Sequence, residues 1–315
     1  MLDISIIIVS WNARNYLRQC LESIRVTGGT VVRDVIVVDN ASTDGSPDMV
    51  AQDFPEVVLI RSDKNLGFSR ANNLGIQKAR GSCLALVNSD VVVHPDCFQK
   101  LITYLEQRPE VGLVGPKIFG GDGRLQRSCR LLPSVWNIIC QTLGLDYALS
   151  RSSLFSGREM RHWKQENEAE VEVLSGCFWL ARTEAVNKVG VLDERFFFYA
   201  EDVDWCKRFR DANWKVVFFP EATATHFGGG SSSNAPVRYS IEMIRANLTY
   251  WKKHYGIMGK LLYYLLCVVH NAIRVPPLAL LTVAGVGNKP ENIRRLKENF
   301  YCFRWLVTGV GVSAK

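Results

Sequence analysis

Several patterns are missing from this chain, and each absence removes a class of protein. None of its 9 cysteines stands in a C-x-x-C pair, and their number is odd. Disulfide frameworks normally contain an even number of cysteines and structural zinc sites normally contain C-x-x-C pairs, so we expect free thiols in a reducing, cytoplasmic setting. The apolar run near the N-terminus, ISIIIVS, is too short for the core of a secretion signal. No signal peptide and no N-terminal anchor are therefore expected.

Acidic side chains are scarce in the last part of the chain. Residues 251–315 contain 10 Lys and Arg against 2 Asp and Glu, a net charge of +8, whereas residues 1–250 contain 28 against 29, a net charge of −1. The formal charge of +7 therefore belongs to the tail. A basic tail predicts an anionic partner, and we expect a membrane surface and no nucleic acid.

Long apolar runs are also missing from this tail. The two longest, at 261–269 and 276–287, fall short of the ~18–20 residues that a spanning helix needs. Pro276 and Pro277 are expected to break any helix that joins them. We predict that the tail is helical and lies on a membrane surface as an interfacial amphipathic region. The alternative is a helical subdomain that packs on the core.

The first part of the chain alternates short apolar runs with segments of helical periodicity. This order predicts an α/β fold, with a mainly parallel sheet and helices on both faces. A polar stretch, residues 150–172, is expected to form a mobile loop or lid. Strands are expected at 4–10, 31–40, 57–62, 82–90, 111–119, 171–181 and 215–219, and helices at 13–26, 69–79 and 95–106.

Polar residues follow four of the predicted strands, at Ser10–Asn12, Asp39–Asn40, Ser62–Asp63 and Asn88–Asp90. Ligands of open parallel sheets bind at the carboxyl ends of the strands. The sequence therefore predicts a ligand-binding rim along this edge.

A second polar group follows the aromatic run RFFFYA. Glu201 and Asp202 come directly after it, and a carboxylate sheltered by apolar walls can have its pKa tuned for proton transfer. Asp204 is interpreted as a solvent-facing residue or one that interacts with the helix dipole. His226, next to the glycines at 228–230, is a candidate metal ligand or phosphate contact. The glycines and Ser231–Ser233 are expected to form a mobile loop.

Seven segments together resemble the family-2 inverting glycosyltransferases, and within them the bacterial rhamnosyltransferase-like branch of surface-polysaccharide assembly. They lie in family order between residues 4 and 233. The resemblance implies a GT-A, Rossmann-like fold. The segments are IIIVSWN, VIVVDNASTDGS, NLGFSRANNLGI, LALVNSDVVV, LSGCFWLARTEAV, FFFYAEDVDWCKR and ATATHFGGGS.

The resemblance assigns a donor site to the strand ends. The residue that matches Asp39 contacts the nucleotide base, because a carboxylate suits the imide N–H of uracil or thymine; capping of the next turn is the alternative. Ser10, Trp11 and Asn12 help to hold the base and ribose, although plain packing would also explain Trp11. The loop and helix start that carry Asn65, Gly67 and Arg70 suit a phosphate or ribose, unless they form only a capped surface helix.

The resemblance also assigns a reaction centre. The segment from Asn88 to Asp90 occupies the place of a D-x-D motif, so we expect Asp90 to hold Mg²⁺ or Mn²⁺ and Asn88 to contact the donor; an ordinary turn is the alternative. His226 would complete the metal site. Asp202 would be the general base, and Glu201 would support it or bind the acceptor.

The expected activity is inverting transfer of a sugar, with dTDP-L-rhamnose as the best single donor, to a glycan or lipid-linked oligosaccharide at the inner face of the membrane. A UDP-hexose donor is the alternative. We expect a transferase domain at 1–235, with a nucleotide-binding half 1–120 and an acceptor half 121–235, and a membrane-surface tail at 236–315.

Proteins of other classes remain open at this point. A nucleotidyltransferase would require a Gly-rich loop with basic residues after the first strand, where this chain has SWNARN and no glycine. A glycosidase needs no nucleotide rim. A non-catalytic sugar-binding protein has no physical reason to keep Asp39, Asp90, Asp202 and His226 together.

Overall fold

The computed structural model describes residues 3–27, 31, 33–228, 236–287 and 289–310. The chain divides into two compact units, each with its own packing. Unit 1 comprises Met1–Leu132, Trp163–Phe197 and Glu201–Gly228, and unit 2 comprises Pro133–His162, Phe198–Ala200 and Gly229–Lys315. The expected loop at Gly229–Ser233 lies outside the described residues, and the predicted domain boundaries at 120 and 235 stay predictions.

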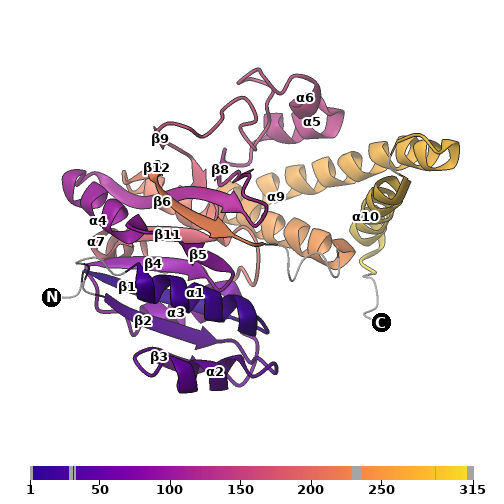
Figure 1. Ribbon diagram of the computed structural model, residues 1–315. Coiled ribbons are helices and arrows are strands. Elements are labelled where there is room, and N and C mark those ends of the chain that lie inside the picture. The colour runs from indigo at the N-terminus through magenta and orange to yellow at the C-terminus, as the bar shows by residue number, and fades with distance from the viewer. Residues whose placement is uncertain (1–2, 28–30, 32, 229–235, 288, 311–315) are drawn as a thin grey trace. The chain divides into compact units, whose positions relative to one another are not determined.

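A large sheet forms the centre of unit 1 (Figure 1). The first four strands in spatial order run parallel, β11 is antiparallel to both its neighbours, and β12 is again parallel to β6. The predicted mainly parallel sheet is therefore confirmed. The spatial order is β3 (Val58–Arg61), β2 (Arg33–Asp39), β1 (Ile4–Ser10), β4 (Cys83–Asn88), β11 (Phe178–Arg182), β6 (Val111–Gly120), β12 (Lys215–His226) and β5 (Val91–Val93).

Four short strands complete the β structure of the described residues. β7 (Leu125–Gln126) pairs with β6, and β9 (Ala169–Glu170) pairs with β12. β8 (Cys129–Arg130) and β10 (Val173–Leu174) form a separate antiparallel pair.

Helices cover both faces of the sheet, because the strand residues alternate between two apolar layers. Ile6 of β1 belongs to one core cluster with Leu17 of α1 (Arg14–Val26), and this cluster also includes residues of α2 (Ser46–Asp53) and α4 (Cys97–Gln107). Ile7 points the other way: a Cβ on Gly75 of α3 (Phe68–Ile76) would lie 2.4 Å from its Cγ2 atom.

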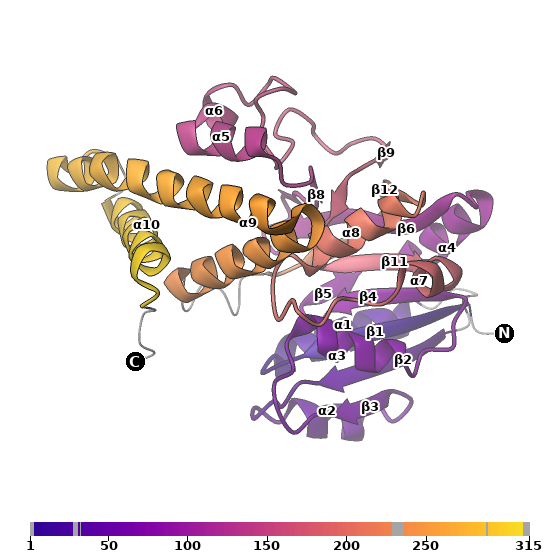
Figure 2. The same ribbon diagram turned by 180° about the vertical axis from the view of Figure 1, so that it is seen from behind.

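The second face also carries α7 (Thr183–Val189) and α8 (Glu201–Asp211), which Figure 2 shows from behind. Trp179 of β11 packs against Trp205 of α8, with 5.2 Å between the ring centroids. The indole N–H of Trp205 donates to the carbonyl of Gly190 at the end of α7. The predicted helices on both faces are confirmed.

The last strand of the sheet is longer than the predicted strand 215–219. β12 continues through an irregularity between Phe219 and Thr223 and ends at His226. There His226 pairs with Val91 of β5 and with Gly120 of β6. The extension carries the histidine to the same edge of the sheet at which β4 ends.

Unit 2 is helical, as predicted for the tail, and consists mainly of α5 (Val135–Leu143), α6 (Leu145–Ala148), α9 (Pro236–Ala284) and α10 (Lys289–Thr308). A hydrogen bond of 2.9 Å joins Thr142 of α5 to His270 of α9. The hydroxyl of Tyr264 in α9 donates to the carbonyl of Leu306 in α10, at 2.8 Å, so α10 runs back along α9.

The predicted break at the proline pair is wrong. Helical structure continues through Pro276 and Pro277, and the interruption lies at Gly256, with φ 69° and ψ −165°. Proline loses a helix hydrogen bond but has a φ that a helix accepts, whereas Gly256 adopts a backbone conformation that other residues rarely visit. The two apolar runs therefore share one helix, which is long and apolar enough by length and composition to cross a membrane, contrary to our expectation for the separate runs.

Candidate active site

The nucleotide rim begins where β1 and β2 end side by side. Ser10 pairs with Asp39 in the strand register, and Val9 pairs with Asn88 of β4 on the other side. Both Ser10 Oγ and Asp39 Oδ1 are buried and have no hydrogen-bond partner among the described residues. Buried polar atoms normally have a partner, so these two atoms fit a polar ligand. The other oxygen of Asp39 accepts from the backbone N–H of Ser42 at 3.1 Å, so the turn-capping alternative holds as well.

Trp11 and Asn12 follow Ser10, and they differ in how they are engaged. Trp11 is 44% exposed, which leaves its ring available to a ligand. Asn12 instead ties two turns together: its Oδ1 accepts from the backbone N–H of Thr43 at 2.8 Å, and its own N–H donates to Ser42 Oγ at 3.0 Å. A donor contact for Trp11 and for Asn12 stays a prediction.

The turn before α3 is organised by Asn40, one of the polar residues of the predicted rim. Its amide donates to Asn65 Oδ1 at 3.0 Å, and its Oδ1 accepts from the N–H of Leu66 at 2.7 Å. Gly67 has a φ of 79°, and a Cβ there would lie 2.5 Å from the carbonyl oxygen of Phe197. Asn65 and Gly67 therefore shape the loop, and their predicted donor contacts stay predictions.

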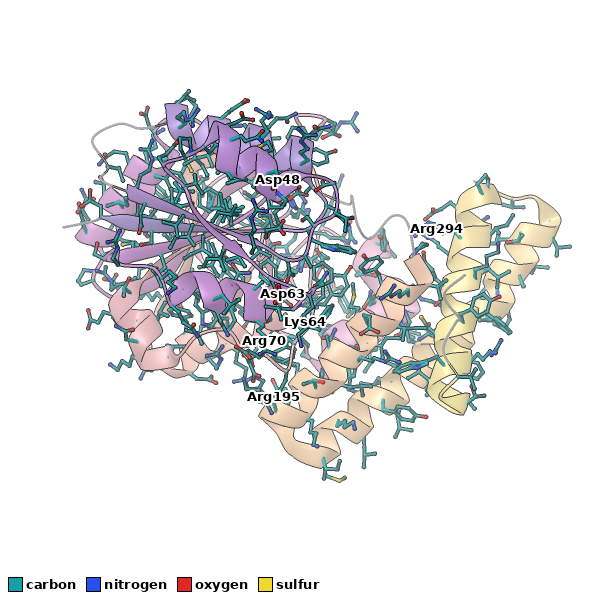
Figure 3. The ribbon with its side chains drawn as sticks, turned by 90° about the horizontal axis from the view of Figure 1, so that it is seen from below. Asp48, Asp63, Lys64, Arg70, Arg195 and Arg294 are labelled. Carbon is teal, nitrogen blue, oxygen red and sulfur yellow. The ribbon has the colours of Figure 1, made fainter. Side chains whose placement is uncertain are left out.

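Arg70, labelled in Figure 3, lies on α3 beside this loop. Its Nε atom is 3.8 Å from Glu194, and both side chains are about half exposed. One turn further along, Asn73 is buried and joins Leu192 by hydrogen bonds of 2.8 and 3.1 Å. Asn73 thus fixes the loop that follows α7, while the guanidinium of Arg70 remains accessible to an anionic ligand.

The predicted metal ligands come together at the end of β4. His226 Nε2 lies 3.2 Å from Asp90 Oδ1, and the amide of Asn88 lies 3.5 Å from the same nitrogen. The second Asp90 oxygen accepts from the backbone N–H of Gly228 at 3.1 Å. The side-chain amide of Gln126 contacts His226 Nδ1 at 3.0 Å, and this contact orients the imidazole ring. No sequence motif predicts the contact.

This donor set fits a small divalent cation. A carboxylate oxygen and an imidazole nitrogen are accepted by Mn²⁺ and, for the carboxylate, by Mg²⁺. Within the described residues, no group of three or more His, Cys, Asp and Glu side chains could hold a metal by itself. Asp90 and His226 would therefore leave coordination positions for donor phosphate and water.

The predicted base lies across a short turn from this pair. The backbone N–H of Asn88 donates to the carbonyl of Cys177 at 2.9 Å, and a Cβ on Gly176 would lie 3.7 Å from Asp202 Cβ. Asp202 is buried at the start of α8, and its Oδ2 lies 3.4 Å from a guanidinium nitrogen of Arg130. Burial raises the pKa of the Cys177 thiol to about 11; Asp90 raises it further and Arg130 lowers it, so the charges on both sides of the turn reach Cys177.

Glu201 has a different environment from Asp202. Its side chain is buried, and Oε2 has no hydrogen-bond partner among the described residues. Burial raises its pKa to about 8, and the adjacent charge of Asp202 contributes in the same direction. Glu201 is therefore mostly protonated at neutral pH, whereas a general base must be ionised.

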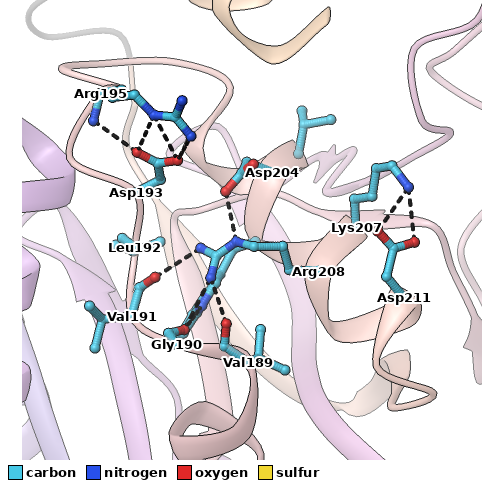
Figure 4. Close-up of polar contacts among 12 residues, drawn as sticks. Val189, Gly190, Val191, Leu192, Asp193, Arg195, Asp204, Lys207, Arg208 and Asp211 are labelled. Carbon is cyan, nitrogen blue, oxygen red and sulfur yellow. Dashed lines mark hydrogen bonds and ion pairs between the residues drawn. The ribbon is translucent and has the colours of Figure 1, made fainter. Parts of the chain in front are cut away.

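Asp204 is not solvent-facing, which corrects our expectation. It is fully buried and accepts from Arg208 Nε at 2.9 Å. The same guanidinium donates to the carbonyls of Val189, Gly190 and Val191 (Figure 4). The pair is a structural link between α8 and the end of α7, since a buried carboxylate needs a partner of opposite charge.

Comparison with known proteins shows the family of the chain. The model of the family Glycosyl transferase family 2 matches residues 5–190. The chain belongs to glycosyl transferase family 2. It is therefore a glycosyltransferase, and the resemblance of its motifs to family 2 is confirmed.

Among curated proteins, this glycosyltransferase is similar to an N-acetylglucosaminyl-diphospho-decaprenol L-rhamnosyltransferase of Mycobacterium tuberculosis, with 28% identity over 246 residues, 74% of this chain and 79% of the relative. It is also similar to the low-salt glycan biosynthesis hexosyltransferase Agl10 of Haloferax volcanii, with 26% identity over 68% of this chain and 64% of the relative.

Solved structures share the GT-A fold. The mannosyltransferase PcManGT from Pyrobaculum calidifontis, in complex with GDP-Man and Mn²⁺, matches with a TM-score of 0.58 and 15% identity over 96% of this chain and 86% of its own. TarS of S. aureus, in complex with UDP-GlcNAc, matches with a TM-score of 0.53 and 16% identity over 97% and 82%.

Proposed function

We propose that this glycosyltransferase moves a sugar, best assigned as L-rhamnose from dTDP-L-rhamnose, onto a hydroxyl of a glycan or lipid-linked oligosaccharide in cell-surface polysaccharide synthesis. The similarity to the mycobacterial L-rhamnosyltransferase supports the sugar and the lipid-linked acceptor. The observation that carries the proposal is the arrangement of Asp90 with His226 on one side of the 175–177 turn and Asp202 on the other.

The donor base is assigned to the end of β2. Asp39 Oδ1, buried and open to a ligand, can accept the imide N–H that thymine and uracil share. Ser10 Oγ lies on the next strand and can contact the base or ribose. Because both bases offer the same N–H, a UDP-hexose remains the second candidate donor.

The reaction we propose is a single displacement with inversion. Asp202 accepts the proton of an acceptor hydroxyl, whose oxygen attacks the anomeric carbon from the face opposite the diphosphate. The bond between that carbon and the diphosphate oxygen breaks as the new glycosidic bond forms, and nucleoside diphosphate leaves with the electron pair. Arg130 orients the Asp202 carboxylate, and neutral Glu201 avoids a second negative charge beside it.

Asp90 and His226 would hold Mg²⁺ or Mn²⁺ at the donor diphosphate. The cation, when bound, offsets charge that builds on the leaving group. Gln126 holds the His226 ring and fixes which nitrogen faces Asp90. Asn88, an amide in place of a carboxylate, adds no charge and is assigned to a donor contact. Arg70 is assigned to the donor pyrophosphate, because its guanidinium is about half exposed and can bind phosphate oxygens.

We assign the enzyme to the cytoplasmic side of the cell membrane as a peripheral protein. The net charge of +8 in residues 251–315 supports this, because each Lys or Arg near an anionic bilayer contributes about 1 kcal/mol before screening.

The purified protein should be incubated with dTDP-L-rhamnose or a UDP-hexose, a lipid-linked acceptor and Mg²⁺ or Mn²⁺. Released nucleoside diphosphate should appear with dTDP-L-rhamnose, and NMR should show a product whose anomeric configuration is opposite to that of the donor. Turnover of a UDP-hexose alone would replace the donor assignment, and retained configuration would reject the single displacement.

A further inference from the structure

The second half of α9, residues 257–284, exposes large apolar side chains along one face. With 100° per residue, eight of them fall within an arc of about 120°, and their exposed fractions run from 42% to 87%. We call this set the apolar stripe: Met258, Leu261, Leu262, Leu265, Val269, Ile273, Leu280 and Val283.

The opposite face of the same helix is polar and packed inside unit 2. His270 bonds to Thr142 of α5 at 2.9 Å, Arg274 donates to the carbonyl of Gln141, and Asn271 is buried. Burial lowers the pKa of His270 to about 4, so this face holds it neutral at physiological pH. In water, an amphipathic helix turns its apolar face inward and its polar face outward. The polarity of α9 is reversed, which is the arrangement expected where the outer environment is hydrocarbon.

Charge along the sequence points to the same environment. Between residues 261 and 288 the only charged side chain is Arg274, which lies on the inner face. Basic residues collect on both sides of this segment, at Lys252, Lys253 and Lys260 before it and at Arg294, Arg295 and Lys297 after it. An apolar stripe flanked by cations is typical of a helix that lies in the interface of a bilayer with anionic headgroups.

The return helix argues against a membrane span. α10 starts beside the far end of α9, where Asn292 donates to the carbonyl of Val286 at 2.8 Å, and runs back to Tyr264 (Figure 2). Its first turns carry the ion pairs of Arg294 with Glu291 and Glu298. If α9 spanned the bilayer, α10 would have to cross with these charges, which is costly in hydrocarbon. The stripe is also about 38 Å long at 1.5 Å per residue, longer than the ~30 Å hydrocarbon core.

We propose that the apolar stripe lies in the plane of a bilayer that contains anionic lipids, with its side chains among the upper parts of the acyl chains. One face of α9 then holds the enzyme on the membrane surface, and the basic residues add to the affinity. This proposal deepens the membrane part of the proposed function, and its test involves no sugar transfer, so either can fail alone.

The first test is flotation of the full-length protein with phosphatidylcholine vesicles, with and without 30% phosphatidylglycerol. We expect binding to the anionic vesicles that persists, though weakened, in 1 M NaCl, because apolar contacts are not screened. Leu265→Asp and Val283→Asp should each lower lipid partitioning about tenfold or more, because each removes one apolar side chain that the bilayer would bury. Val26→Asp is the matched control: Val26 is 82% exposed on α1, against 87% for Val283, and lies outside the stripe.

The second test measures depth. The nine cysteines are buried, so single cysteines introduced at Met258, Leu265, Ile273 and Val283 can be labelled selectively with the fluorophore NBD. An in-plane helix predicts a similar blue shift and similar quenching by lipid-borne quenchers at all four positions, with little change for a label at Val26.

Three results would overturn the proposal. Graded depths, with the middle positions deep and the ends shallow, would show that α9 spans the bilayer. Equal binding of Leu265→Asp and the parent protein would show that the stripe does not touch lipid. A dimer in solution that Leu265→Asp dissociates, without vesicle binding by the parent, would assign the stripe to a second copy of the chain.

Discussion

Nε2 of His226 lies 3.2 Å from Oδ1 of Asp90, although the two residues belong to different sequence segments of unit 1. The irregular extension of β12 brings them together, because it carries His226 alongside Val91, the residue after Asp90. The pair occupies the place where the donor diphosphate is expected, so the residues that hold it in position should control metal binding.

Gln126→Ala should weaken Mn²⁺ binding about 10–100-fold, because residues that orient a ligating histidine have effects of this size. Electron paramagnetic resonance of free Mn²⁺ in the presence of donor nucleotide measures this without turnover. Gln52→Ala, on the exposed face of α2, is the control and should leave binding unchanged. Equal Mn²⁺ affinity for Gln126→Ala and Gln52→Ala would show that Gln126 does not orient the metal ligand.

Arg130→Met should lower kcat about 10–100-fold and move the acidic limb of the pH–rate profile to higher pH. The change removes the guanidinium 3.4 Å from Asp202, and removing one partner of a buried charge pair leaves the other uncompensated. Arg130→Lys should restore part of the rate and of the profile. If Arg130→Met shifted only the melting temperature, the residue would be structural and would not position the base.

Glu201→Gln should make stability less dependent on pH. The pKa of Glu201 is raised from 4.5 to about 8, so the folded state holds a proton that the unfolded state releases, and the parent protein loses stability as pH rises from about 5 to 8. The variant's unfolding free energy, relative to the parent's, should rise over this range by at most about 1.4 kcal/mol per pH unit. Urea unfolding at several pH values measures it, with Glu22→Gln as the exposed control. A constant difference across the range would mean that Glu201 is ionised in the folded protein.

Gly67→Ala should destabilise the protein more than Gly123→Ala. Both glycines have a φ near +75° to +79°, and Gly67 also has a ψ of 179°, which puts it in a region of backbone space that essentially only glycine adopts. Only at position 67 would the new Cβ meet a carbonyl oxygen, that of Phe197 at 2.5 Å, whereas position 123 is open. We expect an additional loss of about 1–3 kcal/mol in chemical unfolding and weaker donor binding for Gly67→Ala. Equal losses would show that the loop yields without strain.

The sheet and the strand-end residues could be predicted from sequence because their signals are local. Runs such as ISIIIVS indicate buried strands, and parallel strands place Ser10, Asp39 and Asn88 at one edge by topology alone. The family motifs then led to Asp90, Asp202 and His226. Two of these, Asp90 and His226, are in direct contact.

The remaining features depend on long-range packing that no local pattern records. Arg130 and Gln126 stand outside the quoted motifs, and only the folded chain brings them to Asp202 and His226. Asp204 looked exposed because helix starts favour acids for their dipole, but its partner Arg208 allows it to be buried. The predicted break at Pro276 rests on the hydrogen bond that proline removes from a helix. Helical structure nevertheless continues there, because the fixed φ of proline is one that a helix accepts.

The most direct measurement for the whole account is turnover of Asp202→Asn beside Asp211→Asn, a surface carboxylate of the same helix that pairs with Lys207. Calorimetry with donor nucleotide and Mn²⁺, and release of nucleoside diphosphate in the presence of acceptor, should be compared for both. We predict unchanged donor binding for both variants and a rate lower by about 10²–10⁴-fold for Asp202→Asn alone, because it cannot accept the acceptor's proton. Near-normal turnover of Asp202→Asn would contradict the account.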